Sequence, residues 1–219
     1  MRIYIRFLAY LVVIAWISCA FAGSYEDFFM AVKQDNAKAI ADLLRRGFDP
    51  NTPDPSGVPG LFIALREPSL KVADELIAWP KTNVETRTPQ DESPLMMAAL
   101  KGHLDVARKL IERGADVNKP GWTPLHYAST GGHVPMIELL LENYAFIDAE
   151  SPNGSTPLMM AALYGTPAAV KLLLDSGADP GMRNQLGMTA IDFARRGARK
   201  DAAELIAAAI RAAKPKGSW

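Results

Sequence analysis

Few side chains in this 219-residue sequence could carry out chemistry, and their spacing does not bring them together. The candidate metal or haem ligands are three histidines and two methionine pairs: His103, His126, His133, Met96-Met97 and Met159-Met160. A metal site needs several ligands placed together, and a general base needs a reacting group within hydrogen-bond reach, and these spacings supply neither. We therefore expect no catalytic residue, no metal and no cofactor. A metal- or haem-binding envelope protein remains an alternative.

Several of these candidates lie in a short motif that recurs along the chain. Its four copies are Ser93-Pro94-Leu95-Met96-Met97-Ala98-Ala99, Thr123-Pro124-Leu125-His126-Tyr127-Ala128, Thr156-Pro157-Leu158-Met159-Met160-Ala161-Ala162 and Thr189-Ala190-Ile191-Asp192-Phe193-Ala194. Successive copies begin 30, 33 and 33 residues apart. A fixed period of this size marks a repeat array in which each unit is one supersecondary element.

Each unit is predicted to hold two helices. A Thr or Ser followed by Pro favours the start of a helix. The hydroxyl can accept a hydrogen bond from a backbone amide of the first turn, and Pro lacks only an amide hydrogen that would have no partner there. About ten residues later, 104–111 shows apolar residues at helical spacing, which predicts a second helix. Gly114 and Gly177 then supply the left-handed residue that ends it. The Asp, Asn, Gly and Pro that follow predict a turn.

The repeated motif and its period resemble those of ankyrin-repeat proteins. The resemblance implies an all-α solenoid of stacked helix-turn-helix units with short β-hairpin-like loops. About six repeats are expected within residues 23–213, followed by a tail at 214–219. The expected repeats are 23–52 as amino-terminal cap, 53–86, 87–118, 119–149, 150–182 and 183–213 as carboxy-terminal cap.

Two repeats depart from the pattern. In 53–86 the helices are expected to be short and divided by Pro68, and Trp79-Pro80 stands where a Gly would be usual. In 119–149 the preceding link is three residues shorter than its counterpart, which predicts a clipped loop. Tyr144 also stands where Gly114 and Gly177 stand in the adjacent repeats. Because a Tyr with positive φ is strained, we expect that helix to end differently.

The amino terminus reads as an export signal. Arg2 and Arg6 precede an apolar run at 7–17, and Ala20-Phe21-Ala22 resembles a cleavage site. Cleavage after Ala22 would remove the only cysteine and deliver the chain to a periplasm or the exterior, as in an exported bacterial protein. The alternative is that the segment is retained and tethers a scaffold to the membrane. The 24 basic and 24 acidic side chains give no argument for nucleic acid.

The resemblance also assigns structural roles to the candidate ligands. It implies that the His126 imidazole bonds backbone within its turn and that His103 and His133 cap the second helices. The methionine pairs occupy the fourth and fifth places of the motif, one of which faces the neighbouring repeat, which favours core packing over metal binding. Ser129, Ser155 and Thr166 stand at ordinary repeat positions.

With no catalytic or metal site expected, the candidate function is the binding of a partner at the surface. In ankyrin-like arrays partners usually bind along the concave face and the loop tips. The positions carried over to this chain, as partner-binding candidates, are Trp122, Tyr164, Leu163, Lys101, Leu100, Arg66, Lys33, Asn153 and Thr130. Aromatic side chains at such sites suggest an interface centre, and the bases suggest an acidic partner. The alternative is that Trp122 covers the shortened loop and Tyr164 lies over a neighbouring helix.

The resulting prediction is an exported, non-enzymatic ankyrin-repeat module. It would act as a monomer that binds another protein through its concave face and loop tips, with no nucleic acid and no membrane after cleavage. Such a module could protect, assemble or inhibit an exported enzyme.

Overall fold

The computed structural model describes residues 23–213. The predicted signal peptide at 1–22 and the tail at 214–219 lie outside the described residues. The described chain divides into two compact units, with the boundary after Asn83.

The first unit consists of two helix pairs. Residues 23–33 are helical and are followed by α2 (Ala37–Arg45), and then α3 (Gly60–Arg66) and α4 (Leu70–Ala78) form the second pair. Helix α4 packs against both α2 and α3. It ends at Trp79, which is extended, with ψ of 124°, rather than left-handed. The irregularity predicted for this repeat is therefore present at its end.

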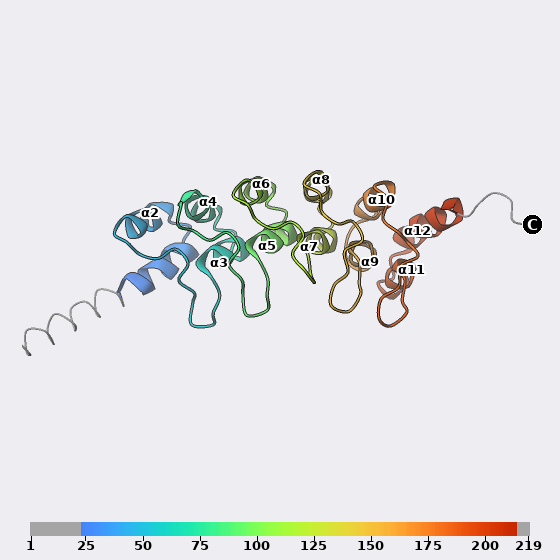
Figure 1. The fold of residues 1–219 in the computed structure, drawn as a ribbon, viewed down its shortest axis with the longest axis horizontal. Helices are drawn as coiled ribbons and strands as arrows, with labels where there is room; N and C mark the ends of the chain where they lie inside the picture. Colours follow the sequence, from blue (N-terminus) through green and yellow to red (C-terminus); the bar gives the residue numbers. More distant parts are fainter. Residues whose placement is uncertain (1–22, 214–219) are drawn as a thin grey trace, which may run out of the picture. The chain divides into compact units, whose positions relative to one another are not determined.

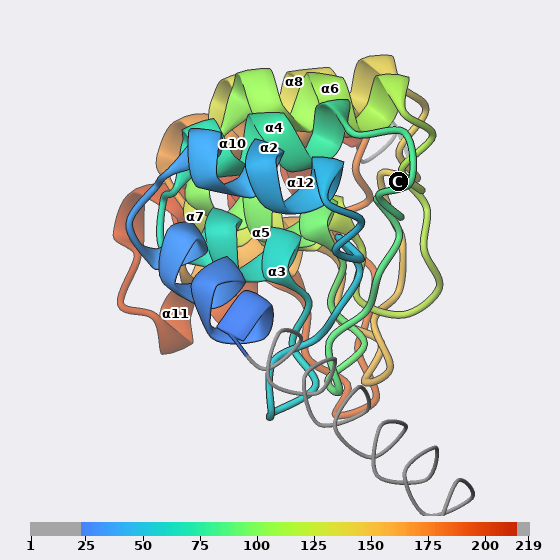
Figure 2. The same ribbon diagram turned by 90° about the vertical axis from the view of Figure 1, so that its left-hand side faces the viewer.

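The second unit holds four helix pairs in two layers. Its helices are α5 (Pro94–Lys101), α6 (Leu104–Glu112), α7 (Pro124–Gly131), α8 (Val134–Glu142), α9 (Pro157–Leu163), α10 (Pro167–Asp175), α11 (Ala190–Arg196) and α12 (Lys200–Ala213). Helices α5, α7, α9 and α11 pack in sequence as one layer (Figure 1). Helices α6, α8 and α10 pack in sequence as the second layer, which covers the first (Figure 2).

The core of this unit comes from the recurring motif. Leu95, Leu125 and Leu158 are fully buried at equivalent places in three neighbouring helices. Burying each leucine side chain contributes about 2 kcal/mol to folding. Because no single helix pair can bury its own leucine, each repeat depends on the next one for its stability.

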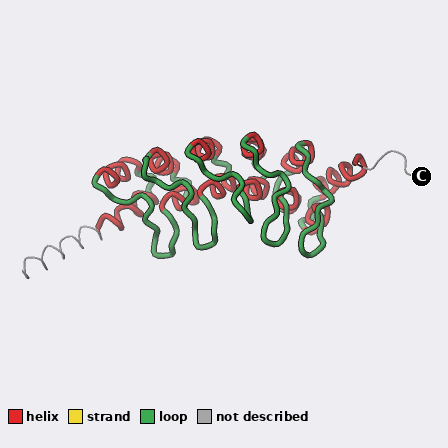
Figure 3. Tube along the Cα trace, viewed as in Figure 1, coloured by secondary structure: helices red, strands yellow, loops and turns green. Residues whose placement is uncertain are grey.

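Loops join each second-layer helix to the next first-layer helix, and no strand forms among residues 23–213 (Figure 3). This confirms the all-α prediction. Each of four loop tips is instead closed by backbone bonds, one of which runs from an amide to the carbonyl four residues on. The bonds of this kind are Asp54 to Val58 at 2.9 Å, and Thr88 to Glu92, Ser151 to Ser155 and Asn184 to Met188 at 3.0 Å each.

The short loop between α6 and α7 is held by a side chain. Lys119 is buried, and its Nζ donates to the carbonyl of Pro120 at 2.9 Å and pairs with the carboxylate of Asp91 in the preceding loop. This bond lowers the pKa of Asp91, although partial desolvation opposes the shift. An ammonium therefore ties the clipped loop to its neighbour.

Tyr144 contradicts the prediction that its helix ends differently. Its φ is +63°, in the left-handed region that Gly114 and Gly177 occupy at +87° and +97°. The same closing bond follows each of them: the amide of Ala145 donates to the carbonyl of Leu140 at 2.9 Å. Stacking of the repeats therefore imposes the helix end, and the tyrosine accepts the strain.

Replacing Tyr144 by Gly is expected to stabilise the protein. A left-handed residue with a Cβ is strained by about 1 kcal/mol relative to glycine, so Tyr144→Gly should raise the free energy of unfolding by about that amount. Urea denaturation measures the change. The matched control is Gly177→Tyr, which should lower the free energy of unfolding. An unchanged or lower stability for Tyr144→Gly would show that the ring makes contacts that outweigh the strain.

Candidate functional site

The candidate ligand side chains in the recurring motif form hydrogen bonds with the backbone. Ser93 Oγ accepts from the amide of Met96 at 3.2 Å, and Met96 Sδ accepts from the amide of Ser93 at 3.3 Å. Thr156 and Met159 repeat this reciprocal pair at 3.4 Å in each direction. Met96 and Met159 are both buried. Their sulfur atoms therefore cap helices. In residues 23–213, no three His, Cys, Asp or Glu side chains gather where they could hold a metal ion.

His126 joins two repeats. Its Nδ1 accepts from the amide of Thr123 at 3.1 Å, which makes Nε2 the protonated nitrogen, and Nε2 lies 2.9 Å from the carbonyl oxygen of Ser155 in the next repeat. The bond within the turn is the expected one, and the bond to Ser155 was not foreseen. Burial lowers the pKa of His126 to about 4, although bonds to backbone carbonyls partly oppose the shift. The ring is thus neutral and fully buried, and both of its nitrogen atoms take part in structural hydrogen bonds.

His103 and His133 occupy the capping positions expected of them, but their side chains do not cap. Both stand at the first position before a second-layer helix. His133 instead reaches back, and its Nε2 lies 3.0 Å from the carbonyl oxygen of Leu100 at the end of α5. Its ring leaves no room for a Cβ at Gly102 or Gly131. Contact with the preceding repeat therefore takes precedence over the local cap.

A ladder of side-chain bonds runs along the base of the loops. In each step a side chain accepts from a backbone amide in the following repeat. The steps are Asn51 to Asn83 at 2.7 Å, Glu85 to Asp116 at 2.9 Å, Asn118 to Phe146 at 2.8 Å and Asp148 to Asp179 at 3.1 Å. Desolvation raises the pKa of Asp148, although the bond from Asp179 opposes this shift. These bonds fix the order of residues along this edge within each unit.

The structure brings together some of the predicted partner-binding residues and separates others. In the second unit, Leu100 and Lys101, Thr130, and Leu163 and Tyr164 stand at the ends of the packed helices α5, α7 and α9. Asn153 is exposed in the loop before α9. Lys33 and Arg66 are also exposed, but they belong to the first unit, and Arg66 pairs with Glu67 at 3.2 Å.

Trp122 is less open than expected. It is half-buried, and its ring meets the imidazole of His126 edge-on with centroids 5.2 Å apart. This contact favours the alternative that Trp122 covers the shortened loop. Thr130 and the two leucines are half-buried as well, and the Thr130 hydroxyl donates to the carbonyl of His126 at 2.8 Å.

Tyr164 differs from these residues because its side chain is 57% exposed. It is the carboxy-terminal cap of α9, and the equivalent places are taken by Gly131, the last residue of α7, and by Gly197, the cap of α11. Neither flanking repeat therefore has a side chain at that place to cover the ring. The exposed bases Lys101 and Arg196 end two other helices of the same layer. The helix ends thus present one open aromatic ring and positive charge.

Sequence reasoning missed a second group of exposed apolar side chains. Tyr144 is 85% exposed and Phe146 is 66% exposed, both in the loop after α8. Asp116 and Asp179 stand at the place of Phe146 in the adjacent repeats. The replacement of aspartate by phenylalanine was a signal in the sequence that could have identified this site.

Comparison with protein families shows to which family this helix array belongs. The family model described as ankyrin repeats (3 copies) matches residues 28–120, 61–151, 118–184 and 147–215. This chain belongs to the ankyrin-repeat family. Ankyrin repeats mediate protein–protein binding and are typically not enzymatic. Within the described part of this ankyrin-repeat chain, no helix is both long and apolar enough to cross a membrane.

Curated ankyrin-repeat relatives match only through part of their length. The chain is 39% identical over 119 residues to the ankyrin repeat and SAM domain-containing protein 6 of Mus musculus, covering 52% of this chain and 13% of that protein. It is 32% identical over 162 residues to the nuclear factor NF-kappa-B p105 subunit of Gallus gallus, covering 71% of this chain and 16% of that one. The likeness is therefore confined to a small part of each relative.

Two solved structures match most of this ankyrin-repeat chain. One is an ankyrin repeat domain from Acinetobacter baumannii, with 26% identity, a TM-score of 0.70, and coverage of 83% of this chain and 96% of that one. The other is a chain of the complex between a predatory endopeptidase from Bdellovibrio bacteriovorus and an immunity protein. That match has 28% identity, a TM-score of 0.72, and coverage of 83% and 97%.

Proposed function

We propose that this ankyrin-repeat protein is exported and binds another exported protein through the first-layer helix ends of its second unit. The observation that carries the proposal is the open ring of Tyr164 between two glycine places. An aromatic side chain that the repeat array leaves 57% exposed is the kind of group that forms the centre of a protein interface. Lys101 and Arg196 suit a partner with acidic groups around its contact site.

We further propose that binding blocks an exported enzyme. Two observations support this role. The amino-terminal sequence has the layout of a cleavable export signal. The chain is also similar over 83% of its length to a chain from a complex of an endopeptidase with an immunity protein. A repeat protein that covers an enzyme needs a rigid surface and no chemistry of its own. This agrees with the use of His126, Met96 and Met159 in structural hydrogen bonds.

Removing the Tyr164 ring is expected to weaken partner binding about 30-fold. This factor corresponds to the loss of about 2 kcal/mol for one aromatic side chain at an interface centre. The immobilised mature protein should first capture its partner from the exported fraction of the source cells. The purified partner is then titrated by calorimetry against wild type and Tyr164→Ala. The melting temperature of the variant should stay within about 1 °C of wild type, because the ring lies in solvent.

The matched control for this titration is Met30→Ala. It removes another exposed apolar side chain, in the first unit, and should leave affinity unchanged. Equal binding by Tyr164→Ala and wild type would remove the helix ends from the interface. A captured enzyme whose activity is the same with and without the protein would contradict the blocking role and leave binding in place.

Export is tested separately from binding. Mass spectrometry of the protein recovered from its native cells should show a mature chain that begins at Gly23. A retained amino terminus in the membrane fraction would identify a tethered scaffold instead.

A further inference from the structure

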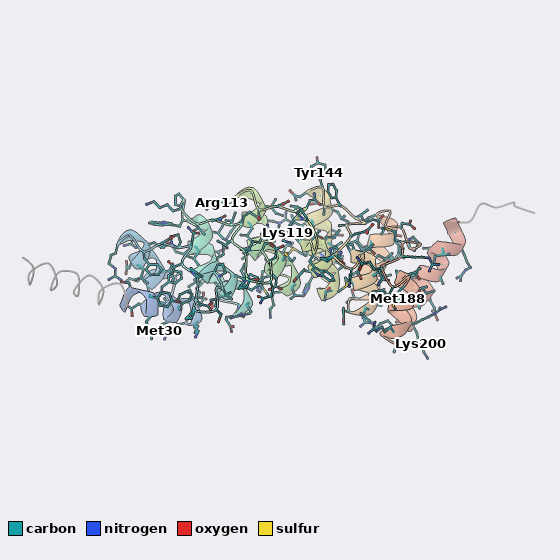
Figure 4. The ribbon with its side chains drawn as sticks, turned by 60° about the horizontal axis from the view of Figure 1, so that its bottom comes forward. Met30, Arg113, Lys119, Tyr144, Met188 and Lys200 are labelled. Atoms are coloured by element: carbon teal, nitrogen blue, oxygen red, sulfur yellow. The ribbon has the colours of Figure 1, made fainter. Side chains whose placement is uncertain are left out.

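A second exposed surface lies at the base of the loops in the second unit, away from the helix ends that carry Tyr164. Tyr144 and Phe146 occupy it, two residues apart after α8, and Figure 4 shows Tyr144 projecting from the ribbon. The adjacent repeats have Gly and Asp at these two places. Two neighbouring departures from the repeat pattern have thus each placed an aromatic ring in solvent.

The fold holds the two rings on the solvent side of the loop. Asn118 fixes the backbone of both residues, since its Nδ2 donates to the carbonyl of Tyr144 and its Oδ1 accepts from the amide of Phe146, both at 2.8 Å. Ala145 between them is buried. Tyr144 and Phe146, on either side of this buried alanine, are 85% and 66% exposed, so both rings lie largely in solvent.

Neither ring is needed by the fold. Tyr144 holds a left-handed backbone that glycine would adopt without strain. Phe146 replaces an aspartate that closes its own loop in the adjacent repeats: Asp116 Oδ1 accepts from the amide of Asn118, and Asp179 Oδ1 accepts from the amide of Gly181, both at 2.8 Å. These two positions retain a strained backbone and lack a loop-closing hydrogen bond, and both expose an aromatic ring. This combination points to a role in binding rather than in folding.

Carboxylates flank the rings on both sides. The ladder of side-chain bonds places Asp116 in the repeat before them and Asp148 and Asp179 after them. Asp116 and Asp179 are exposed. At the end of α6, Arg113 adds one base, which already has an interaction of its own. The edge is therefore aromatic and predominantly acidic.

We infer that Tyr144, Phe146, Asp116 and Asp179 form an aromatic edge that docks an arginine- or lysine-rich segment of a partner protein. A guanidinium can stack on the aromatic faces while it pairs with the carboxylates beside them. The same edge of a second copy is disfavoured, because like charges would face each other. Phosphate-bearing partners are disfavoured by the same carboxylates. This edge is separate from the Tyr164 surface and its charge is opposite.

The test uses a fluorescein-labelled peptide of alternating Arg and Leu, with an equal-length peptide of alternating Glu and Leu as its charge control. Fluorescence anisotropy at 50 mM salt should show saturable binding of the Arg peptide to the mature protein and no binding of the Glu peptide. The variant Tyr144→Gly with Phe146→Asn gives the first place the glycine of the adjacent repeats and the second an uncharged analogue of their aspartate, so it should fold at least as well without changing the charge of the edge. It is expected to bind the Arg peptide at least tenfold more weakly.

The acidic contribution is tested by Asp116→Asn with Asp179→Asn. Asparagine keeps the acceptor oxygen that closes each loop but removes the charge, so folding should be retained while affinity falls severalfold. Tyr164→Ala should bind the Arg peptide as wild type does, which separates this edge from the proposed enzyme-binding surface. Equal binding by the Tyr144 and Phe146 double variant would overturn the inference. A second result would also overturn it: the Arg peptide fails to bind, while sedimentation shows a dimer of the wild type that the double variant does not form.

Discussion

Lowering the pH from 6.5 to 4 is expected to remove about 3 kcal/mol from the free energy of unfolding through His126 alone. Burial lowers the folded-state pKa of this imidazole to about 4, whereas an unfolded histidine titrates near 6.5. The contribution is complete above pH 6.5, because both states are then neutral. As the pH falls, the unfolded state takes up a proton that the folded state refuses, so stability is lost until pH 4.

The loss has a specific structural cause. Nδ1 of His126 accepts from the amide of Thr123, and a proton on that nitrogen would remove the acceptor inside a fully buried turn. Asp91 and Asp192 also have lowered pKa values, from an ordinary value of 3.8. Their stabilising effect is therefore lost only below the window in which His126 acts. Urea denaturation at half-unit steps of pH between 4 and 7 measures the effect.

The chain itself offers the control for this experiment. Met96 and Met159 fill the equivalent place in the neighbouring repeats, and their sulfur atoms accept the same amide bond. His126→Met should therefore keep the cap and remove the loss of stability that His126 causes between pH 6.5 and 4. At pH 7 it should lose only about 1 kcal/mol, because the carbonyl of Ser155 still accepts from the amide of Ser151. A His126→Met protein that loses stability in acid as steeply as wild type would place the sensitive group elsewhere.

Replacing Gly165 by Ala is expected to lower the free energy of unfolding by about 2–3 kcal/mol. A Cβ at this position would overlap the carbonyl oxygen of Ser129 in α7 and would lie 2.9 Å from the Cα and carbonyl oxygen of Ala161 in α9. All of these atoms are backbone, so no side-chain rotation can relieve the overlap, and α7 and α9 must move apart. The leucines buried between these helices would then lose part of their contacts.

Gly177→Ala distinguishes overlap from ordinary glycine strain. Gly177 has a φ of +97° and open space around its missing Cβ, so its replacement should lower stability by only about 1 kcal/mol. Guanidinium denaturation of both variants compares the two effects. If Gly165→Ala were no more destabilising than Gly177→Ala, the close approach of the repeats at Gly165 would not matter for stability.

The positions of the helices follow from local residue chemistry. Ser or Thr before Pro specifies where α5, α7 and α9 begin, and the hydroxyls of Ser93, Thr123 and Thr156 accept the expected amide bonds. Gly114 and Gly177 are left-handed just past the ends of their helices. These signals lie within a few residues of the feature they predict, so the sequence alone was enough to find them.

Side-chain exposure was harder to predict, because it depends on neighbouring repeats. The openness of Tyr164 reflects Gly131 and Gly197, each 33 residues away along the chain. Trp122 was expected to face solvent, yet its ring is half-buried against His126, because the loop that carries it is short. Phe146 was not identified at all, since its place in the loop is read only by comparison with Asp116 and Asp179.

By itself the sequence determined the repeat period, the helix starts and the use of most apolar side chains as core, because each of these depends on patterns within one repeat. Only the tertiary structure decided that Tyr144 adopts a left-handed backbone and that His133 contacts the preceding repeat instead of capping its own helix. The physical reason is the same in both cases. Stacking buries the leucines of several repeats at once, and that gain exceeds the roughly 1 kcal/mol that favours a different local conformation at any one residue.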